Sequence, residues 1–102
     1  MREDACPNLT YLDLGWNNIN NEGCGQLALG LKVGCPHLQT LNLGSNIIET
    51  LPDALGQLRS LTCLDISYNF IKRIQPALSA LFLQLDTLDA DDDILEDLAS
   101  YV

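Results

Sequence analysis

Leucine recurs at regular intervals along this 102-residue chain, and that periodicity constrains the fold more than any other feature. Four segments follow one template, L-x-x-L-x-L-x-x-N-x-L, with Ile, Ala or Asp at some of the specified positions. They are LTYLDLGWNNI from Leu9, LQTLNLGSNII from Leu38, LTCLDISYNFI from Leu61 and LDTLDADDDIL from Leu85. The starts are 29, 23 and 24 residues apart, so the chain is built from repeats of one structural unit.

The L-x-L centre of each segment predicts a short β-strand. Successive side chains of a strand point to opposite faces, so Leu12 and Leu14 share one face while Asp13 takes the other. A strand this short cannot bury its apolar face alone, so we expect the repeats to stack in parallel around one continuous core. The side chains expected to be most buried belong to the interior repeats: Leu41, Leu43, Leu64 and Ile66.

The Asn position of the template lies where the chain turns away from each strand. It is occupied by Asn17, Asn46, Asn69 and Asp93. An asparagine amide both donates and accepts hydrogen bonds, so it can pair with backbone groups that would otherwise be buried without a partner. We therefore expect a ladder of these four side chains, weaker at Asp93 because an ionised carboxylate cannot donate.

The segments between the strands differ in length and pattern. In the first, apolar residues at helical spacing from Cys24 to Leu31 predict a helix. The second and third are shorter and follow an L-P-x-x-L-x-x-L pattern, for which we expect less regular helix. Near the C-terminus a further helical spacing predicts a short capping helix. Its apolar face would comprise Ile94, Leu95, Leu98 and Tyr101.

These motifs resemble those of the leucine-rich-repeat family over residues 9–102. The first repeat resembles the ribonuclease-inhibitor-like subclass, and the later repeats resemble the shorter L-P-x-x-L-x-x-L subclass. The resemblance implies an α/β leucine-rich-repeat solenoid, an open horseshoe segment with a parallel concave β-sheet and a helical or irregular convex side. We expect one domain over residues 1–102, with repeats at 9–37, 38–60 and 61–84 and a partial repeat at 85–102.

The resemblance also implies that a partner binds the concave sheet face, opposite the leucines. One column of side chains on that face forms an acidic row, interrupted by one amide, which comprises Asp13, Asn42, Asp65 and Asp89. Aromatic side chains beside charges are typical anchors for protein partners. A simpler interpretation is that short polar residues only keep this face soluble. The expected partner-binding residues are Tyr11, Asp13, Trp16, Asn42, Asp65, Tyr68 and Asp89.

The chain is acidic, with 14 acidic and 5 basic residues and a formal net charge of −9. This charge disfavours nucleic acid and anionic membranes, and it favours a protein partner with a basic segment. Residues 86–102 carry seven acids and no base. This tail can be a solvated end that protects the sheet edge, a second site for a basic partner, or a calcium site. For calcium, Ile94 and Ser100 replace the Gly and Glu that an EF-hand loop requires, so we expect no metal.

The sequence offers little support for catalysis. His37 is the only histidine and lies at a repeat junction, so we expect a non-enzymatic protein without a cofactor. The four cysteines contain no C-x-x-C pair. We expect Cys6, Cys24 and Cys35 to be buried apolar fillers and Cys63 to face the concave side.

The role that these observations favour is a protein-interaction module. The alternative is a regulatory leucine-rich-repeat segment of a larger signalling protein or enzyme, of the receptor-like or GTPase-activating type, with flanking repeats in its parent chain. Reduced thiols, and the lack of an apolar leader or a membrane-length apolar run, predict a cytoplasmic location.

Overall fold

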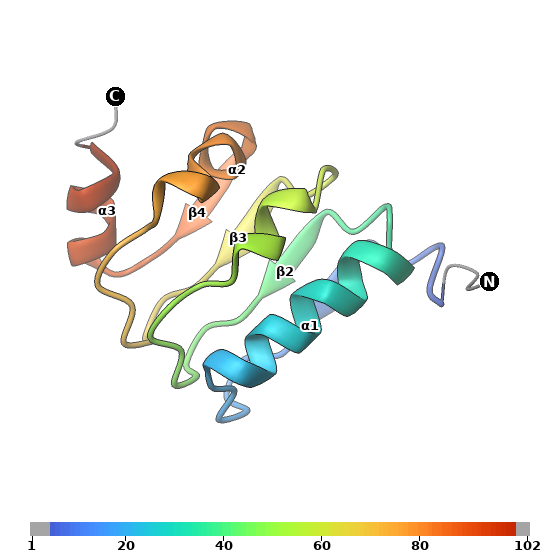
Figure 1. Ribbon diagram of the computed structural model, residues 1–102, viewed down its shortest axis with the longest axis horizontal. Helices are drawn as coiled ribbons and strands as arrows, with labels where there is room; N and C mark the ends of the chain where they lie inside the picture. Colours follow the sequence, from blue (N-terminus) through green and yellow to red (C-terminus); the bar gives the residue numbers. More distant parts are fainter. Residues whose placement is uncertain (1–4, 100–102) are drawn as a thin grey trace.

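A computed structural model describes residues 5–99 of the chain, in which the repeats lie side by side (Figure 1). Each repeat contributes a three-residue strand, and the four strands form one parallel sheet in the order β1-β2-β3-β4. The strands are β1 (Tyr11–Asp13), β2 (Thr40–Asn42), β3 (Cys63–Asp65) and β4 (Thr87–Asp89). The α-helices are α1 (Asn21–Gly34), α2 (Ser79–Gln84) and α3 (Asp92–Ala99), and the 3-10 helices are η1 (Asp53–Gln57) and η2 (Pro76–Leu78).

The register of the sheet confirms the strand alignment expected from the repeat template. The central leucines pair in one row, which comprises Leu12, Leu41, Leu64 and Leu88. The row after it comprises Asp13, Asn42, Asp65 and Asp89, and the row before it comprises Tyr11, Thr40, Cys63 and Thr87. Equivalent residues of successive repeats are therefore neighbours on the sheet, about 4.8 Å apart.

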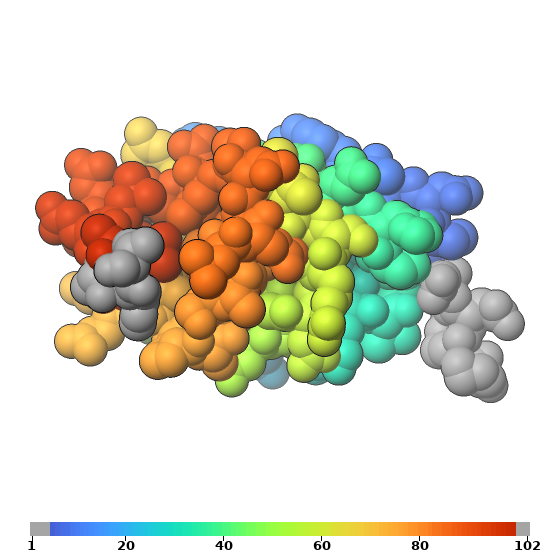
Figure 2. Space-filling model, turned by 90° about the horizontal axis from the view of Figure 1, so that it is seen from above, coloured from blue at the N-terminus to red at the C-terminus, as the bar shows by residue number. Residues whose placement is uncertain are grey.

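The helical segments cover one face of the sheet. Helix α1 contacts η1, which in turn contacts α2, so the helices form a second layer in the order of the repeats (Figure 1). The space-filling view shows the repeats as successive bands from the blue N-terminal end to the red C-terminal end (Figure 2). The molecule measures 41 × 29 × 19 Å. The sheet thus keeps one face that no helix of the described part of the chain covers.

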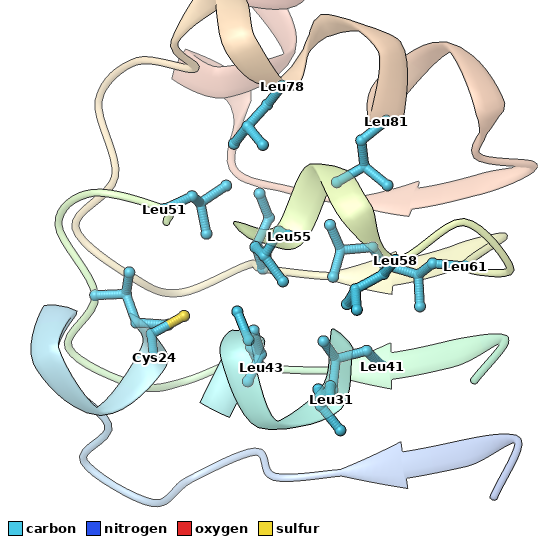
Figure 3. Packing of buried hydrophobic residues seen from close by; sticks show 14 of the residues in the cluster. Cys24, Leu31, Leu41, Leu43, Leu51, Leu55, Leu58, Leu61, Leu78 and Leu81 are labelled. Atoms are coloured by element: carbon cyan, nitrogen blue, oxygen red, sulfur yellow. The ribbon is translucent and has the colours of Figure 1, made fainter. Parts of the chain in front are cut away.

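The hydrophobic core lies between the sheet and the helical layer. Leucines from β2 and its loop meet leucines of α1, η1 and α2 there (Figure 3). All four side chains expected to be most buried, Leu41, Leu43, Leu64 and Ile66, are buried. In the first repeat Leu12 and Leu14 are only half-buried, because β1 is an edge strand with one neighbour.

Helix α1 forms where the apolar spacing predicts it. Its N-cap residue Asn20 accepts a hydrogen bond from the backbone N–H of Gly23 at 2.9 Å, which satisfies one of the free donors of the first turn. Cys24, Ala28 and Leu31 form its buried stripe. The second repeat has the short 3-10 helix η1 in the same layer, as the shorter connection predicts.

At the C-terminal end, α3 confirms the predicted capping helix. Ile94 is buried and Leu98 is half-buried, but the assignment of Leu95 to the same packed face is wrong, because this side chain is exposed. The carboxylate of Asp97 accepts a hydrogen bond from the backbone N–H of Ile74 at 3.0 Å, which attaches α3 to the loop of the preceding repeat. Tyr101, the fourth residue of the predicted apolar face, lies outside the described residues.

The asparagine ladder is centred on Asn46, the only buried polar side chain among residues 5–99. Its Oδ1 accepts hydrogen bonds from the backbone N–H groups of Asn17 and Ile19, both at 2.9 Å. Its Nδ2 donates to the carbonyl oxygens of Leu14 at 3.1 Å and Leu43 at 3.0 Å. One side chain therefore joins the loop of its own repeat to that of the preceding repeat.

Asn69 repeats this arrangement one repeat further along. Its Oδ1 accepts a hydrogen bond from the backbone N–H of Ile48 at 3.0 Å. Its Nδ2 donates to the carbonyl oxygens of Leu43 at 2.9 Å and Ile66 at 3.2 Å. Asn69 is half-buried rather than fully buried, so this second connection is more accessible to water.

The two ends of the predicted ladder differ from the expectation. Asn17 is exposed, and its Nδ2 donates only within its own repeat, to the carbonyl oxygen of Gly15 at 3.1 Å. The assignment of Asp93 to the ladder is wrong: this residue is exposed in the first turn of α3. After Asp91 the backbone begins a helix and no longer follows the loop conformation of the earlier repeats. The carbonyl oxygen of Asp91 accepts a hydrogen bond from the backbone N–H of Ile94. A carboxylate in the first turn of a helix is favoured by the helix dipole, which explains the position of Asp93.

Candidate functional site

The uncovered sheet face holds all seven residues that the sequence predicts for partner binding. Two adjoining hollows divide them. An open hollow of about 850 Å³ at the carboxyl ends of the strands is lined by Asp13, Trp16, Asn42, Asp65 and Tyr68. A smaller one of about 190 Å³ over the strands themselves is lined by Tyr11 and Asp89, and it shares Asn42 and Asp65 with the first. The acidic row therefore runs between the two hollows.

The acidic row also holds the loops that follow the strands. The Oδ1 of Asp13 accepts from the backbone N–H of Gly15 at 2.9 Å, and the Oδ1 of Asn42 accepts from Gly44 at 2.7 Å. Asp65 Oδ1 accepts from the backbone N–H and the hydroxyl of Ser67, at 2.9 and 2.6 Å. Such local turns explain why a short polar residue stands at this position in the first three repeats. Within residues 5–99, the Oδ2 atoms of Asp13 and Asp65 accept no hydrogen bond, so one oxygen of each remains available to a ligand.

The glycines next to this row allow the repeats to approach closely. A Cβ atom at Gly44 would lie 3.1 Å from both Asn42 Oδ1 and Asp65 Oδ1. At Gly15 the corresponding atom would lie 3.3 Å from Asp13 Oδ1 and from the carbonyl oxygen of Gly44. The absence of side chains at these two positions therefore keeps the polar side chains of the row accessible from the open face.

The aromatic residues of the site are strongly exposed. Trp16 is 86% exposed and Tyr68 is 77% exposed. Both occupy the same place in their repeats, directly before the ladder asparagine, and both have left-handed backbone, with φ of 63° and 55°. Their backbones are held by hydrogen bonds to the next repeat: Trp16 N–H donates to Gly44 O at 3.1 Å and Tyr68 N–H to Asp91 Oδ1 at 2.9 Å.

Two apolar residues of the larger hollow are not among those predicted from the sequence. Ile47 is 43% exposed and Phe70 is 60% exposed, and both line the hollow with Trp16 and Tyr68. Each directly follows its ladder asparagine and precedes a buried isoleucine. Large apolar side chains at an outward position of the template are the signal that could have identified them.

The electrostatics of this face are uniform in sign. The residues that line the two hollows include no lysine, arginine or histidine. The bases Lys72 and Arg73 instead line another hollow, together with Glu49 and Asp53, which borders the larger one at Phe70. A ligand on the open sheet face therefore meets carboxylates without competing cations from the lining residues.

The cysteines divide into different environments. Cys24 and Cys35 are buried as expected, and burial raises the pKa of the Cys24 thiol to about 11. Cys63 is half-buried in β3, in the smaller hollow. The expectation for Cys6 is wrong, because this residue is exposed. It occupies the same template position as Cys35, but Cys35 has a further repeat stacked beside it.

Two other kinds of site are absent from the described part of the chain. Residues 5–99 contain no group of three or more His, Cys, Asp or Glu side chains positioned to hold a metal ion. No helix among the same residues has the length and apolar character needed to cross a bilayer.

An open parallel sheet, backed by helices and joined by asparagine side chains, defines a repeat protein of the solenoid class with one exposed sheet surface. One family model described as leucine-rich repeat matches residues 26–71 and 36–94, and a second so described matches residues 5–28. The chain belongs to the leucine-rich-repeat family. Domains of this family generally mediate protein–protein interactions and typically have no enzymatic activity of their own.

Two proteins show similarity in sequence. A histone of Tetrahymena thermophila is 37% identical over 91 residues, which cover 81% of this chain and 22% of that protein. Adenylate cyclase of Schizosaccharomyces pombe is 29% identical over 94 residues, which cover 91% of this chain and 5% of that protein. The chain thus spans less than a quarter of the length of either relative. No solved structure matches the chain significantly.

Proposed function

We propose that this chain is a non-enzymatic protein-interaction module whose open sheet face binds a basic segment of a partner protein. The observation that supports this most directly is the combination of acidic and exposed aromatic residues around the larger hollow. Burial of Trp16 and Tyr68 by a partner supplies apolar contact area, and the free oxygens of Asp13 and Asp65 supply charge-assisted hydrogen bonds.

The acidic row indicates the direction in which the proposed partner segment would run across the sheet. Asp13, Asp65 and Asp89 lie in one register row, so a basic segment that crosses the strands meets them in turn. Charges at the rim of an interface mainly speed association, whereas buried aromatic anchors mainly slow dissociation. The two groups of residues therefore predict different kinetic effects.

The test compares removal of charge from the open sheet face with removal of charge from a helix outside that face. Asp13→Asn with Asp65→Asn removes two charges from the open face but keeps the Oδ1 acceptors that hold the loops. Asp93→Asn with Glu96→Gln removes the same charge from exposed positions in α3, which line neither hollow, and serves as the matched control. Partners captured from a lysate at low salt are identified by mass spectrometry, and their association rates are then measured with the purified proteins.

We expect the open-face variant to lower the association rate and its salt dependence, with no change in the control. Tyr68→Ala should mainly raise the dissociation rate. Partners that bind all variants equally, or that lose binding only with the control, would contradict the proposal. In that case the interaction would involve the helical side instead.

The second candidate is a regulatory segment of a longer signalling protein or enzyme, of the receptor-like or GTPase-activating type. The similarity to 5% of an adenylate cyclase supports this candidate, because there the matching segment is a small part of a much larger protein. The half-buried leucines of β1 would allow a flanking repeat to pack against that edge. Sequencing the full transcript tests this candidate: an attached catalytic domain would support it, and a transcript that encodes only these repeats would exclude it.

A further inference from the structure

Three neighbouring residues of the larger hollow share an uncommon backbone conformation. Trp16, Ser45 and Tyr68 directly precede the ladder asparagines of successive repeats, and their φ angles are 63°, 58° and 55°. Left-handed backbone is unfavourable for residues with bulky side chains and is usually left to Gly, Asn or Asp. Trp16 and Tyr68 are strongly exposed, so burial of their side chains contributes little free energy to offset the cost of this conformation. Ser45 has the same conformation, so the turn of each of these repeats imposes it, and the aromatic residues occupy it without burial as compensation.

The equal conformation and the hydrogen-bond register place the three side chains in a row. The backbone N–H of Ser45 donates to Ser67 O at 2.9 Å, in the same way that Trp16 is held by Gly44. With strands about 4.8 Å apart, Trp16 and Tyr68 begin about 10 Å from each other, and the small Ser45 lies between them. A cation above Ser45 would lie between the two aromatic side chains, and rotation of either side chain can bring its ring within the roughly 6 Å over which a cation is attracted.

The space between Trp16 and Tyr68, above Ser45, is called the slot, and its surroundings favour a positively charged ligand. Asp13 and Asp65 line the same hollow, each with one carboxylate oxygen that the described residues leave without a hydrogen bond. No base is among the residues that line the hollow. Ile47 and Phe70 extend it with an apolar surface. The slot therefore combines two exposed aromatic side chains, nearby anionic acceptors and an adjoining apolar patch.

We infer that the slot between Trp16 and Tyr68, above Ser45, binds an arginine side chain of the partner protein. A guanidinium is planar and weakly hydrated, so it can stack between two rings while its N–H groups reach the free oxygens of Asp13 or Asp65. A lysine ammonium carries the same charge but is compact and strongly hydrated, and it cannot stack. A neighbouring apolar side chain of the partner would contact Ile47 and Phe70. This inference rests on the proposed function and specifies its central contact.

The single tryptophan of the chain provides the reporter. Three blocked peptides, acetyl-Gly-X-Leu-Gly-amide with X as arginine, lysine or citrulline, are titrated against the full chain at millimolar concentrations. The indole N–H signal of Trp16 is followed by NMR. Citrulline has nearly the shape of arginine without its charge, and lysine has the charge without the plane. We expect the arginine peptide to bind about two- to fivefold more tightly than the lysine peptide, and the citrulline peptide to bind most weakly.

Two variants of Ser45 separate the slot from the rest of the surface. Ser45→Tyr fills it with a side chain that the same backbone conformation already accepts at Trp16 and Tyr68, and it should weaken the arginine peptide at least about fivefold. Ser45→Gly leaves the slot open and should bind like the wild type. Tyr68→Leu should weaken binding about two- to fivefold, whereas Leu83→Ala, at an exposed position of α2 outside both hollows, should not. Thermal unfolding of each variant verifies that the fold is retained.

Three results would overturn the inference: equal binding of the arginine and citrulline peptides, wild-type affinity in Ser45→Tyr, or no shift of the Trp16 signal. None of them decides the proposed function, because the capture assay depends on the charges of the open face and not on occupation of this slot. Conversely, loss of captured partners in the Asp13→Asn, Asp65→Asn variant together with any of these three results would retain a basic partner but assign its contact elsewhere.

Discussion

Replacing Asn46 by alanine is the most informative test of how the repeats are joined. The side chain is 3% exposed and accepts two backbone hydrogen bonds from the first repeat. Its amide donates to carbonyl oxygens of both repeats. Asn46→Ala removes these bonds and leaves their backbone partners without a substitute inside the protein.

The expected loss in the free energy of unfolding depends on how many of those backbone partners water can reach. A typical hydrogen bond contributes about 1 kcal/mol net, and a buried group left without a partner costs about 1–3 kcal/mol. The amide also donates to the carbonyl oxygen of Gly44 at 3.2 Å, so its two N–H hydrogens are shared among three carbonyl oxygens and the five contacts count as about four full bonds. Four full bonds would give about 4 kcal/mol, but Asn17 is exposed and its N–H can bond to water instead. We therefore expect a loss of about 3 kcal/mol, a large share of the roughly 5–15 kcal/mol that stabilises a typical domain.

Urea unfolding followed by circular dichroism measures this loss, with Asn69→Ala and Asn17→Ala as comparisons. Asn69 is half-buried, so its replacement should cost less, about 2 kcal/mol. The side chain of Asn17 bonds only within its own exposed loop, so its replacement should cost at most about 0.5 kcal/mol. If Asn46→Ala is no more destabilising than Asn17→Ala, the asparagine side chains do not connect the repeats energetically.

Three further predictions concern the core, a thiol and the distribution of stability. Leu64→Ala should cost about 2–5 kcal/mol in urea unfolding, because this side chain lies in an interior repeat; a loss below about 1 kcal/mol would contradict its place in the core. At about pH 8 a thiol reagent should label exposed Cys6 quickly and Cys24 only on unfolding; equal labelling rates would refute the burial of Cys24. Because the pKa of Cys24 is raised from 9.0 to about 11, its contribution to stability is complete below pH 9.0 and is lost as the pH rises through about 11, an effect absent in Cys24→Ala. Amide hydrogen exchange should be slowest over residues 38–70, whose repeats have neighbours on both sides, and uniform protection would contradict this.

The sheet could be predicted from the sequence nearly residue by residue, and the reason is local. The L-x-L alternation determines which side chain faces the core, and the identical template determines which residues become neighbours. Hence Asp13 and Asn42 pair as expected, as do Asp65 and Asp89. In a repeat protein long-range contacts follow from short-range ones, since each unit contacts only the next.

The departures occur where one unit lacks an equivalent neighbour. Asp93 satisfies the template, but no further repeat follows it in the described structure, and helix formation takes over at Asp92. Cys6 matches the position of Cys35 without the stacked repeat that buries Cys35. The hollow could be predicted only in part, because Ile47 and Phe70 join Trp16 through the three-dimensional path of the loops and not through the strand pattern.

The uniform register has a consequence for how such a surface can evolve or be engineered. The distance between Trp16 and Tyr68 depends on the number of repeats between them: it is two strand spacings because one repeat lies between them. Duplication of that repeat would widen the gap by one further spacing, about 4.8 Å, and its deletion would bring the rings together. Neither event would disturb the packing within a unit. The width of this surface therefore changes only in steps of one strand spacing, by gain or loss of whole repeats. Its chemistry, in contrast, can change by substitution of single residues.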